Sequence, residues 1–169
     1  MTGLTEEGLK FLLEQSETGY LKHLSLYGCL IGDAGAEILA NTLAKGSALE
    51  ILDLERTSIT NKGVEVLVAA LPASNLQSLK LGENNIHSTP ELFEFLSDVI
   101  PKSSLRILKI LGHHHSSDWD KVKRLRNKDG DQIMLFDDIN EQSERNVNAQ
   151  KAKVLENIWN NLRAAARFN

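Results

Sequence analysis

A leucine pattern that recurs four times constrains the fold of this chain more than any other feature. The pattern reads LxxLxL, or LxxLxI in its last copy, and begins at residues 21, 49, 76 and 105, so the period is 27 to 29 residues. Two further columns keep the same register: Cys29, Thr57, Asn84 and His113 lie eight residues after the first leucine, and Ile31, Ile59 and Ile86 lie ten after it. A fixed period of this length is typical of repeat architectures in which each unit stacks on the next.

The second half of each repeat predicts an α-helix. In segments 32–46, 61–72 and 89–101, apolar residues recur at helical spacing, so each helix can bury one face. Pro72 is expected to end the second helix. The residues expected on the buried faces are Ala36, Leu39, Ala40, Leu43, Val64, Leu67, Val68, Leu71, Leu92, Phe93, Leu96 and Ile100. Residues 3–13 align with 30–40, so the chain is expected to open halfway through a repeat.

The pattern resembles the leucine-rich-repeat family, whose unit reads L-x-x-L-x-L-x-x-N/C-x-L, over roughly residues 3–112. Units of this length with a helical second half look like the ribonuclease-inhibitor subtype. The resemblance implies a right-handed α/β leucine-rich-repeat solenoid of about four strands, with parallel strands on the concave face and α-helices on the convex face. Thr57 and His113 depart from the family's Asn or Cys, whose side chain bonds to the backbone of the turn. We expect those two turns to be looser.

Beyond Gly112 the leucine register stops, and the rest of the chain is expected to cap the array. The predicted domains are an array over 1–112, with a half repeat at 1–20 and units beginning near 21, 49, 76 and 105, and a helical C-terminal cap or extension over 113–169. Within this extension the pattern predicts a short amphipathic helix at 118–131, a strand or inward-packed loop at 132–139, and a long amphipathic helix at 143–167. The long helix could pack on the end of the array, on a partner or on a second copy. A membrane surface is least favoured, because its polar face lacks a dense basic strip.

Composition argues against several classes of protein. The chain has 169 residues, 41% of them hydrophobic and 25% charged, which is ordinary for a globular domain. Its net charge of −4 argues against a nucleic-acid binder, which needs a concentrated basic surface. One cysteine allows no intrachain disulfide, and no segment reads as a signal peptide or membrane span. We expect a cytoplasmic protein. A short array with a divergent tail also resembles the host-mimicking effectors of intracellular bacterial pathogens, which would place it in the cytoplasm of a host cell.

The residues between the leucines are expected to face the concave surface, because side chains alternate along a strand. Residues of one column lie on neighbouring strands about 4.8 Å apart, so Asp53 should face Lys80. The residues predicted to bind a partner are Tyr27, Ile51, Asp53, Glu55, Lys80, Lys109 and Leu111. Apolar anchors beside charges of both signs suit a protein partner. The alternative is a solvated ladder of lateral salt bridges that binds nothing.

Few residues offer metal or thiol chemistry. His113, His114 and His115, with His87 one repeat earlier, form the only cluster that could hold a metal. Solvated loop histidines explain the cluster equally well, so we predict no metal and no cofactor. Cys29 occupies the family's turn column, where a buried structural thiol is expected. No other cysteine remains for the ubiquitin-ligase chemistry of some bacterial leucine-rich-repeat effectors.

Arg56 and residues 127–131 carry weaker signals. Arg56 follows the second strand and invites comparison with the leucine-rich-repeat activators of the GTPase Ran, although an exposed turn residue is the simpler interpretation. Residues 127–131, NKDGD, lack the spacing of a calcium loop and predict a plain turn. The sequence therefore predicts a non-enzymatic protein–protein interaction module. The alternatives are a GTPase-activating or other enzyme-regulating protein, and an oligomerisation unit that self-associates through the C-terminal helix.

Overall fold

The computed structural model describes residues 4–17, 21–110, 122 and 124–136, all within one compact unit, residues 1–137. Residues 138–169 form a second unit, in which no residue is described. The described elements are α1 (Glu6–Glu17), β1 (His23–Ser25), α2 (Gly32–Ala44), β2 (Ile51–Asp53), α3 (Asn61–Ala70), the 3-10 turn η1 (Leu71–Ala73), β3 (Ser78–Lys80), α4 (Pro90–Val99), the 3-10 turn η2 (Ile100–Lys102), β4 (Ile107–Lys109) and β5 (Met134–Phe136). None of these helices has the length and hydrophobicity needed to span a bilayer.

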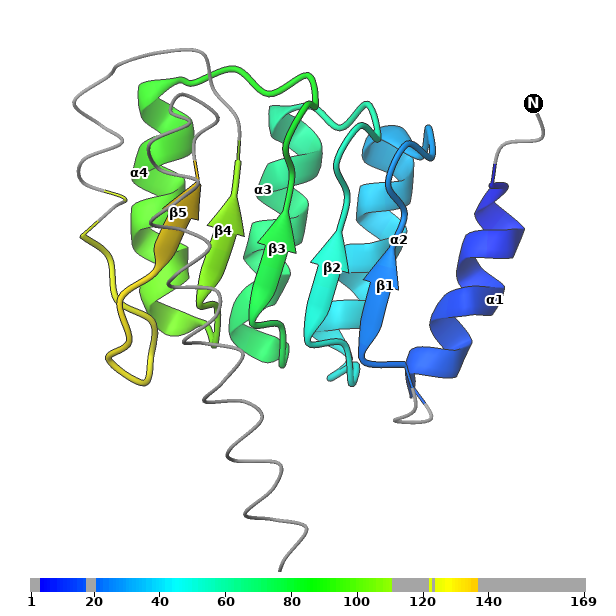
Figure 1. Ribbon diagram of the computed structural model, residues 1–169, viewed down its shortest axis with the longest axis horizontal. Helices are drawn as coiled ribbons and strands as arrows, with labels where there is room; N and C mark the ends of the chain where they lie inside the picture. The colour runs from blue at the N-terminus through cyan, green and yellow to red at the C-terminus, as the bar shows by residue number, and fades with distance from the viewer. Residues whose placement is uncertain (1–3, 18–20, 111–121, 123, 137–169) are drawn as a thin grey trace, which may run out of the picture. The chain divides into compact units, whose positions relative to one another are not determined.

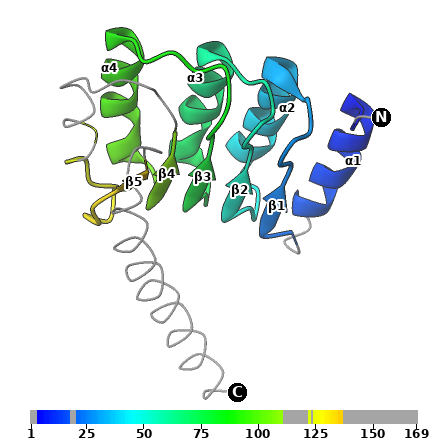
Figure 2. The ribbon, with the colours of Figure 1, turned by 45° about the horizontal axis from the view of Figure 1, so that its top comes forward.

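The five strands form one parallel sheet in sequence order, β1-β2-β3-β4-β5 (Figure 1). Parallel neighbours need a crossover connection, and α2, α3 and α4 supply it for the first four strands. Figures 1 and 2 place these three helices on the same face of the sheet. Helix α1 lies beside α2, and no described strand stands in front of it. The unit is thus an α/β array of strand–helix repeats that opens on a helix.

The repeated leucines form the core between the sheet and the helices. The middle residues of the first four strands are buried: Leu24, Leu52, Leu79 and Leu108. Leu39, Leu67 and Leu96, one from each of α2, α3 and α4, are fully buried. Every residue that the sequence placed on a buried helix face is buried, so the predicted faces are confirmed. Full burial of a leucine side chain contributes roughly 1.5 to 3 kcal/mol, which makes this column a main source of stability.

The helices begin and end where local hydrogen bonding changes. The hydroxyl of Thr60 accepts a hydrogen bond from the N–H of Lys62 at 3.3 Å and caps α3. The hydroxyl of Thr89 accepts from the N–H of Leu92 at 3.3 Å and caps α4. Helices α3 and α4 each pass into a 3-10 turn that contains proline, η1 and η2. Pro72 therefore ends the α-helix as predicted, because proline offers no N–H to continue it.

Asp33, in the first turn of α2, connects its repeat to the next one. Its carboxylate accepts hydrogen bonds from the Thr60 N–H at 2.8 Å, the Thr60 hydroxyl at 2.7 Å and the Gly63 N–H at 3.1 Å. One repeat later, the side chain of Asn61 bonds to both backbone groups of His87, at 2.7 and 2.8 Å. Burial alone raises the pKa of Asp33. The hydrogen bonds from Thr60 and Gly63 and the charge of Lys62 lower it by more, so the pKa of Asp33 lies below its ordinary value.

Replacing Asp33 by Asn should therefore destabilise the protein near neutral pH and matter less in acid. A carboxyl whose pKa is lowered on folding stabilises the folded state above its unfolded pKa, about 3.9, and this contribution is lost as the pH falls through the folded value. Urea unfolding at about pH 6 and about pH 3 should show the gap between wild type and Asp33→Asn shrinking in acid. A gap of equal size at both pH values would contradict the assignment.

Asp98→Asn is the control for this measurement. Asp98 is an exposed carboxylate on α4, and among the described residues it pairs with Lys102, four residues on, at 2.8 Å. The substitution should change the free energy of unfolding by less than about 1 kcal/mol, because an exposed pair of this kind contributes little.

The turn after β2 is well bonded, so the prediction that Thr57 would loosen it is wrong. Thr57 is completely buried, and its hydroxyl donates to the carbonyl of Leu54 at 2.7 Å. Its N–H donates to the side-chain oxygen of Asn84, in the next repeat, at 2.9 Å. Arg56 and Ser58 flank it with φ of 57° and 62°, in the left-handed region that few residues other than glycine adopt. Local and inter-repeat hydrogen bonds together hold this conformation.

The end of the array differs from the prediction in two respects. Strand β5 pairs in parallel with β4, so the sheet has five strands rather than about four and continues past residue 112. Residues 124–131 are not the second half of a helix: Arg126 forms an antiparallel bridge with Gln132, and residues 128–130 form the turn between them. The Asn127 side-chain oxygen accepts from the N–H groups of Asp129 and Asp131 at 3.0 and 2.9 Å, and Gly130 has φ 84°. The plain turn predicted at 127–131 is confirmed. Leu111, the histidines at 113–115 and the predicted helix at 143–167 lie outside the described residues.

Candidate partner-binding face

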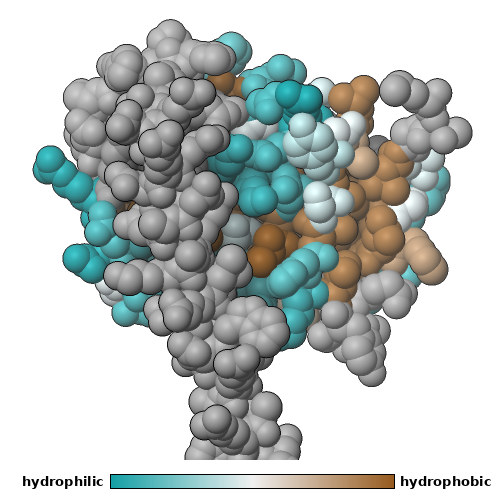
Figure 3. All heavy atoms as spheres, viewed as in Figure 1, coloured by the Kyte–Doolittle hydropathy of each residue, from teal (hydrophilic) through white to brown (hydrophobic). Residues whose placement is uncertain are grey.

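The sheet face opposite α2, α3 and α4, which we call the strand face, carries most of the predicted site. The third residues of the four LxxLxL segments lie side by side on it and form its third-position column, which Met134 of β5 continues: His23, Ile51, Ser78, Ile107 and Met134. Its fifth-position column is Ser25, Asp53, Lys80 and Lys109. The lateral register read from the sequence is therefore confirmed for the four repeats. Figure 3 shows hydrophilic side chains over the middle of this face and hydrophobic ones toward α1.

Two ion pairs join strands across the strand face. Lys80 donates to Asp53 on the neighbouring strand at 3.1 Å, as the sequence predicted. Lys109 lies 2.6 Å from Glu55, which follows β2, and so reaches past β3 altogether. The residue of β3's repeat that occupies the column of Glu55 is Gly82, which has no side chain to block this reach. The sequence analysis missed the second pair, although Gly82 in that column was its signal.

The carboxylates of these pairs are the least exposed charges of the face. The side chains of Asp53 and Glu55 are only 16% and 12% exposed, against 38% and 27% for Lys80 and Lys109. Asp53 also accepts a hydrogen bond from the N–H of Glu55 at 3.2 Å. Charges removed from water to this degree interact more strongly than surface pairs, and removing one partner leaves the other unbalanced. The strand face therefore presents charges in fixed positions.

Tyr27 lies where the strands end, beside Arg56. The guanidinium of Arg56 lies over the Tyr27 ring, 5.7 Å from its centroid, and also pairs with Glu83 of the third repeat. The hydrogen bond to Glu83, and then its charge, raise the pKa of Arg56, which stays protonated. Tyr27 remains 50% exposed. A rigid aromatic ring held against a cation and open to solvent is the kind of anchor that protein interfaces use.

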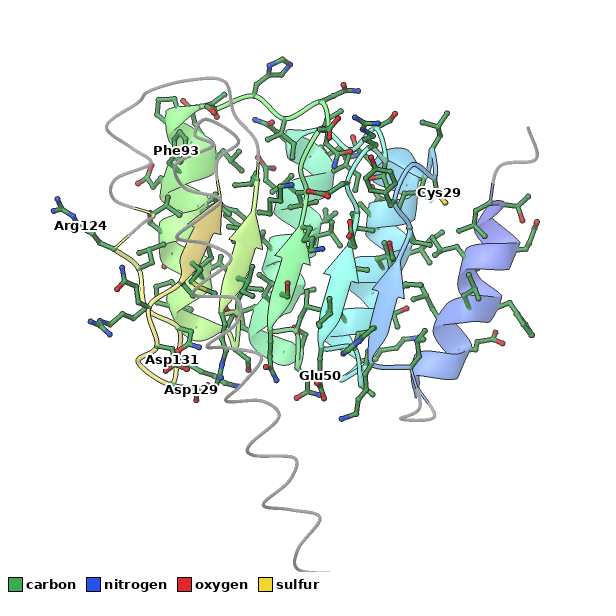
Figure 4. The ribbon with its side chains drawn as sticks, viewed as in Figure 1. Cys29, Glu50, Phe93, Arg124, Asp129 and Asp131 are labelled. Atoms are coloured by element: carbon green, nitrogen blue, oxygen red, sulfur yellow. The ribbon has the colours of Figure 1, made fainter. Side chains whose placement is uncertain are left out.

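A shallow polar pocket lies where the strands begin, between the ion pairs Lys22–Glu50 (2.7 Å) and Arg106–Asp131 (3.2 Å). Figure 4 labels Glu50, Asp129 and Asp131 along this edge of the sheet. The pocket has a volume of about 230 Å³, and its lining consists of Glu50, Asn75, Gln77, Ser104, Arg106 and Asp129. Sites for drug-sized ligands are larger and mostly apolar, so this pocket does not fit a drug-sized ligand.

The remaining chemical candidates do not gather into a metal site in the part of the chain that the structure describes. No group of three or more His, Cys, Asp or Glu side chains among those residues is arranged to hold a metal. His87 is exposed, and its backbone is bonded to Asn61. Cys29 is half-buried rather than buried as predicted, because no preceding strand covers its turn (Figure 4).

Comparisons with known proteins agree with this geometry. Residues 20–40 and 48–68 match the family model described as a leucine-rich repeat. Over 124 residues, 70% of this chain, the sequence is 35% identical to the human "NACHT, LRR and PYD domains-containing protein 13", and it spans 12% of that protein's length. The fold is similar to the solved "Leiomodin-1 Actin-Binding Site 2 (ABS2)", with a TM-score of 0.62 and 13% identity, over 90% of this chain and 96% of that one. At that identity the likeness shows the fold alone. The two matched segments are leucine-rich repeats, and the human relative and the shared fold support a leucine-rich-repeat protein.

Proposed function

We propose that the chain binds a partner protein through the strand face, with Tyr27, Ile51, Asp53, Glu55, Lys80, Lys109 and Leu111 as the contacting residues. The observation that carries this proposal is the pair of half-buried ion pairs, Asp53–Lys80 and Glu55–Lys109, fixed across three strands. Side chains that are already ordered lose less conformational entropy on binding. Ile51 and Ile107 lie half-buried beside them and supply apolar contact.

The alternative interpretation is a salt-bridge ladder that only solubilises the face. An exposed pair adds about 0 to 1 kcal/mol, which would make the ladder a minor stabilising feature. Partner binding accounts better for Tyr27, because an aromatic side chain left 50% exposed at the rim of a charged face does not improve solubility. The leiomodin neighbour is named for an actin-binding site, which supports protein binding as a use of this fold.

The role of Arg56 follows from its contacts. Its guanidinium forms an ion pair with Glu83 and lies over the Tyr27 ring. These contacts support a role for Arg56 at the rim of the strand face. We therefore favour a non-enzymatic module over a GTPase-activating one. We also propose the ribonuclease-inhibitor subtype, supported by a full α-helix in each second half and by the 27- to 29-residue period. A solenoid closed by a C-terminal cap, self-association through the predicted C-terminal helix and a cytoplasmic location stay predictions.

A triple substitution tests the strand face against a matched control. The variant Ile51→Ala, Lys80→Ala, Lys109→Ala removes one apolar and two basic side chains from the face. The control Val66→Ala, Lys62→Ala, Lys45→Ala removes the same chemistry from α3 and the end of α2. Candidate partners are captured from lysate with wild type and both variants, and the dissociation constant is then measured with the purified partner.

We expect the triple strand-face variant to bind at least about tenfold more weakly than wild type, which corresponds to about 1.4 kcal/mol or more. The control should stay within about twofold. Part of the weakening should appear as a lower salt dependence, because two charges are gone. Equal affinity of wild type and the strand-face triple variant for every captured partner would rule out the strand face.

A further inference from the structure

The charges of the repeats are divided unequally between the helices and the strands. Helices α2, α3 and α4 contain six acidic residues and one basic residue. The second, third, fifth and seventh positions of the four leucine segments contain four basic residues and three acidic ones: Lys22, Lys80, Arg106, Lys109, Glu50, Asp53 and Glu55. These helices therefore carry an excess of negative charge, and the strands do not.

The two ion pairs that cross the strand face hold their basic groups outward. The side chains of Lys80 and Lys109 are more than twice as exposed as those of their partners Asp53 and Glu55. In two ion pairs of the helical side, the carboxylates are instead 51% and 70% exposed. A molecule that approaches the strand face thus meets ammonium groups first, and one that approaches the helices meets carboxylates.

Lys80 is placed to bond to a further acceptor. Its ammonium group has three N–H donors, and the described residues supply one acceptor for it, the Asp53 carboxylate at 3.1 Å. Lys109 is its neighbour on the adjacent strand, and such strands lie about 4.8 Å apart, so both charges attract a negative group bonded to Lys80. Ile51 of β2 and Ile107 of β4 lie half-buried on either side of β3 and supply apolar contact nearby.

We propose that the strand face takes an acidic segment of a partner protein. A carboxylate of this segment bonds to Lys80 beside Lys109, and its apolar side chains contact the two isoleucines. This inference rests on the proposed function and specifies the chemistry of its partner. Charge complementarity identifies the occupant, because helices α2, α3 and α4 repel an acidic segment and the outward ammonium groups attract it. A basic segment would be drawn to the helices instead. The two isoleucines favour a protein segment over a nucleic acid, whose phosphates they cannot bond.

A fluorescent peptide made of Glu-Leu-Glu-Gly repeats serves as the acidic probe. Two peptides of equal length, made of Gln-Leu-Gln-Gly and of Lys-Leu-Lys-Gly repeats, keep its apolar side chains and change only its charge. Fluorescent oligothymidylate tests a nucleic acid as the occupant. These probes together separate the sign of the charge from the class of macromolecule.

The variants change the charge at the strand face without removing its apolar residues. Lys80→Gln with Lys109→Gln removes both ammonium groups. Lys62→Gln with Lys102→Gln is the matched control, because these lysines belong to the two ion pairs of the helical side. Asp53→Asn keeps the shape of the side chain and removes the charge that neutralises Lys80.

Fluorescence anisotropy should show saturable binding of the acidic probe to wild type. Binding should be at least about tenfold weaker to the Lys80, Lys109 variant and within about twofold of wild type for the Lys62, Lys102 control. Asp53→Asn should bind the acidic probe more tightly than wild type, because a competing carboxylate is gone. The glutamine and lysine peptides and oligothymidylate should bind at least about tenfold more weakly than the acidic peptide. Circular dichroism should confirm that all variants are folded.

Several results would overturn the proposal. They are the absence of saturable binding of the acidic probe, equal affinity of the two folded double variants, weaker binding to Asp53→Asn than to wild type, and preference for the lysine peptide or for oligothymidylate. A captured partner that Ile51→Ala weakens and the Lys80, Lys109 variant does not would also overturn it, while the proposed function would stand. Captured partners that the strand-face triple variant leaves unaffected would instead remove the proposed function, whatever the peptides do.

Discussion

Replacing Asn84 by Ala is expected to lower the free energy of unfolding by roughly 3 to 5 kcal/mol. The Asn84 side chain makes six hydrogen bonds within and between repeats. Its oxygen accepts from the N–H groups of Thr57 and Ile59 at 2.9 and 3.1 Å, and its amide donates to the carbonyls of Leu54 and Leu81 at 2.7 and 3.0 Å. Alanine would remove this partner from the N–H groups of Thr57 and Ile59 and from the Leu81 carbonyl, while the Leu54 carbonyl would keep its bond from the Thr57 hydroxyl. Each backbone group left unpaired costs about 1 to 3 kcal/mol when buried.

Urea unfolding followed by circular dichroism measures this loss, and Asn85→Ala is its neighbouring control. The side chain of Asn85 is exposed, and only its backbone N–H bonds to the repeat before, at 2.9 Å to Ile59. The control should therefore change stability by less than about 0.5 kcal/mol. Thr57→Ala should cost less than Asn84→Ala, because it removes one hydroxyl, whose partners are the Leu54 carbonyl and the Asn84 side chain, and keeps the other bonds of Asn84. Similar losses for Asn84→Ala and Asn85→Ala would show that the inter-repeat amide is not what holds the turns.

The repeat register predicted the sheet and its lateral neighbours because both depend on periodicity alone. A period near 28 residues places Ile51 beside Ser78 and Asp53 beside Lys80, and this pairing does not depend on the conformation of the loops between the strands. The buried helix faces follow from the same periodicity, since every apolar column found in α2, α3 and α4 has a strand leucine to pack against.

The parts that could not be predicted depend on side-chain reach and on competition between local structures. The pair Lys109–Glu55 joins two residues on either side of β3. The repeat period predicts only which residues of adjacent strands are neighbours, so it does not predict this pair. Of the helix predicted at 118–131, the described residues 124–131 are not helical, because the Asn127 side chain bonds to the backbone that a helix would need. Strand β5 carries no LxxLxL pattern, so the sequence predicts either a strand or an inward-packed loop at residues 132–139, and the pairing with β4 shows that the strand is correct. Thr57 showed no loosening because Asn84, a whole repeat away in sequence, completes its turn.

Replacing Gly63 by Ala is expected to destabilise the protein by roughly 2 to 4 kcal/mol, although helix propensity alone predicts the opposite sign. Alanine normally gains up to about 1 kcal/mol over glycine within a helix. Here, a Cβ on Gly63 would collide with the Asp33 carboxylate and lie 2.8 Å from the Ile59 side chain. The chain has room at this point only for glycine, because α2 and α3 approach each other closely so that Asp33 can bond the first turn of α3. Overpacking and loss of this cap therefore act together.

A double-mutant cycle separates the two effects. In the background Asp33→Ala the added methyl group no longer meets a carboxylate, so Gly63→Ala should cost measurably less than in wild type, by roughly 1 kcal/mol or more. Glu65→Ala, an exposed position of the same helix, should be close to neutral and controls for helix propensity. If the cost of Gly63→Ala were the same in both backgrounds, the strain would come from the contacts with Ile59 and Ala36, and the cap from Asp33 would not couple the repeats. The cycle therefore asks whether adjacent repeats are held together by this polar contact in addition to the leucine core.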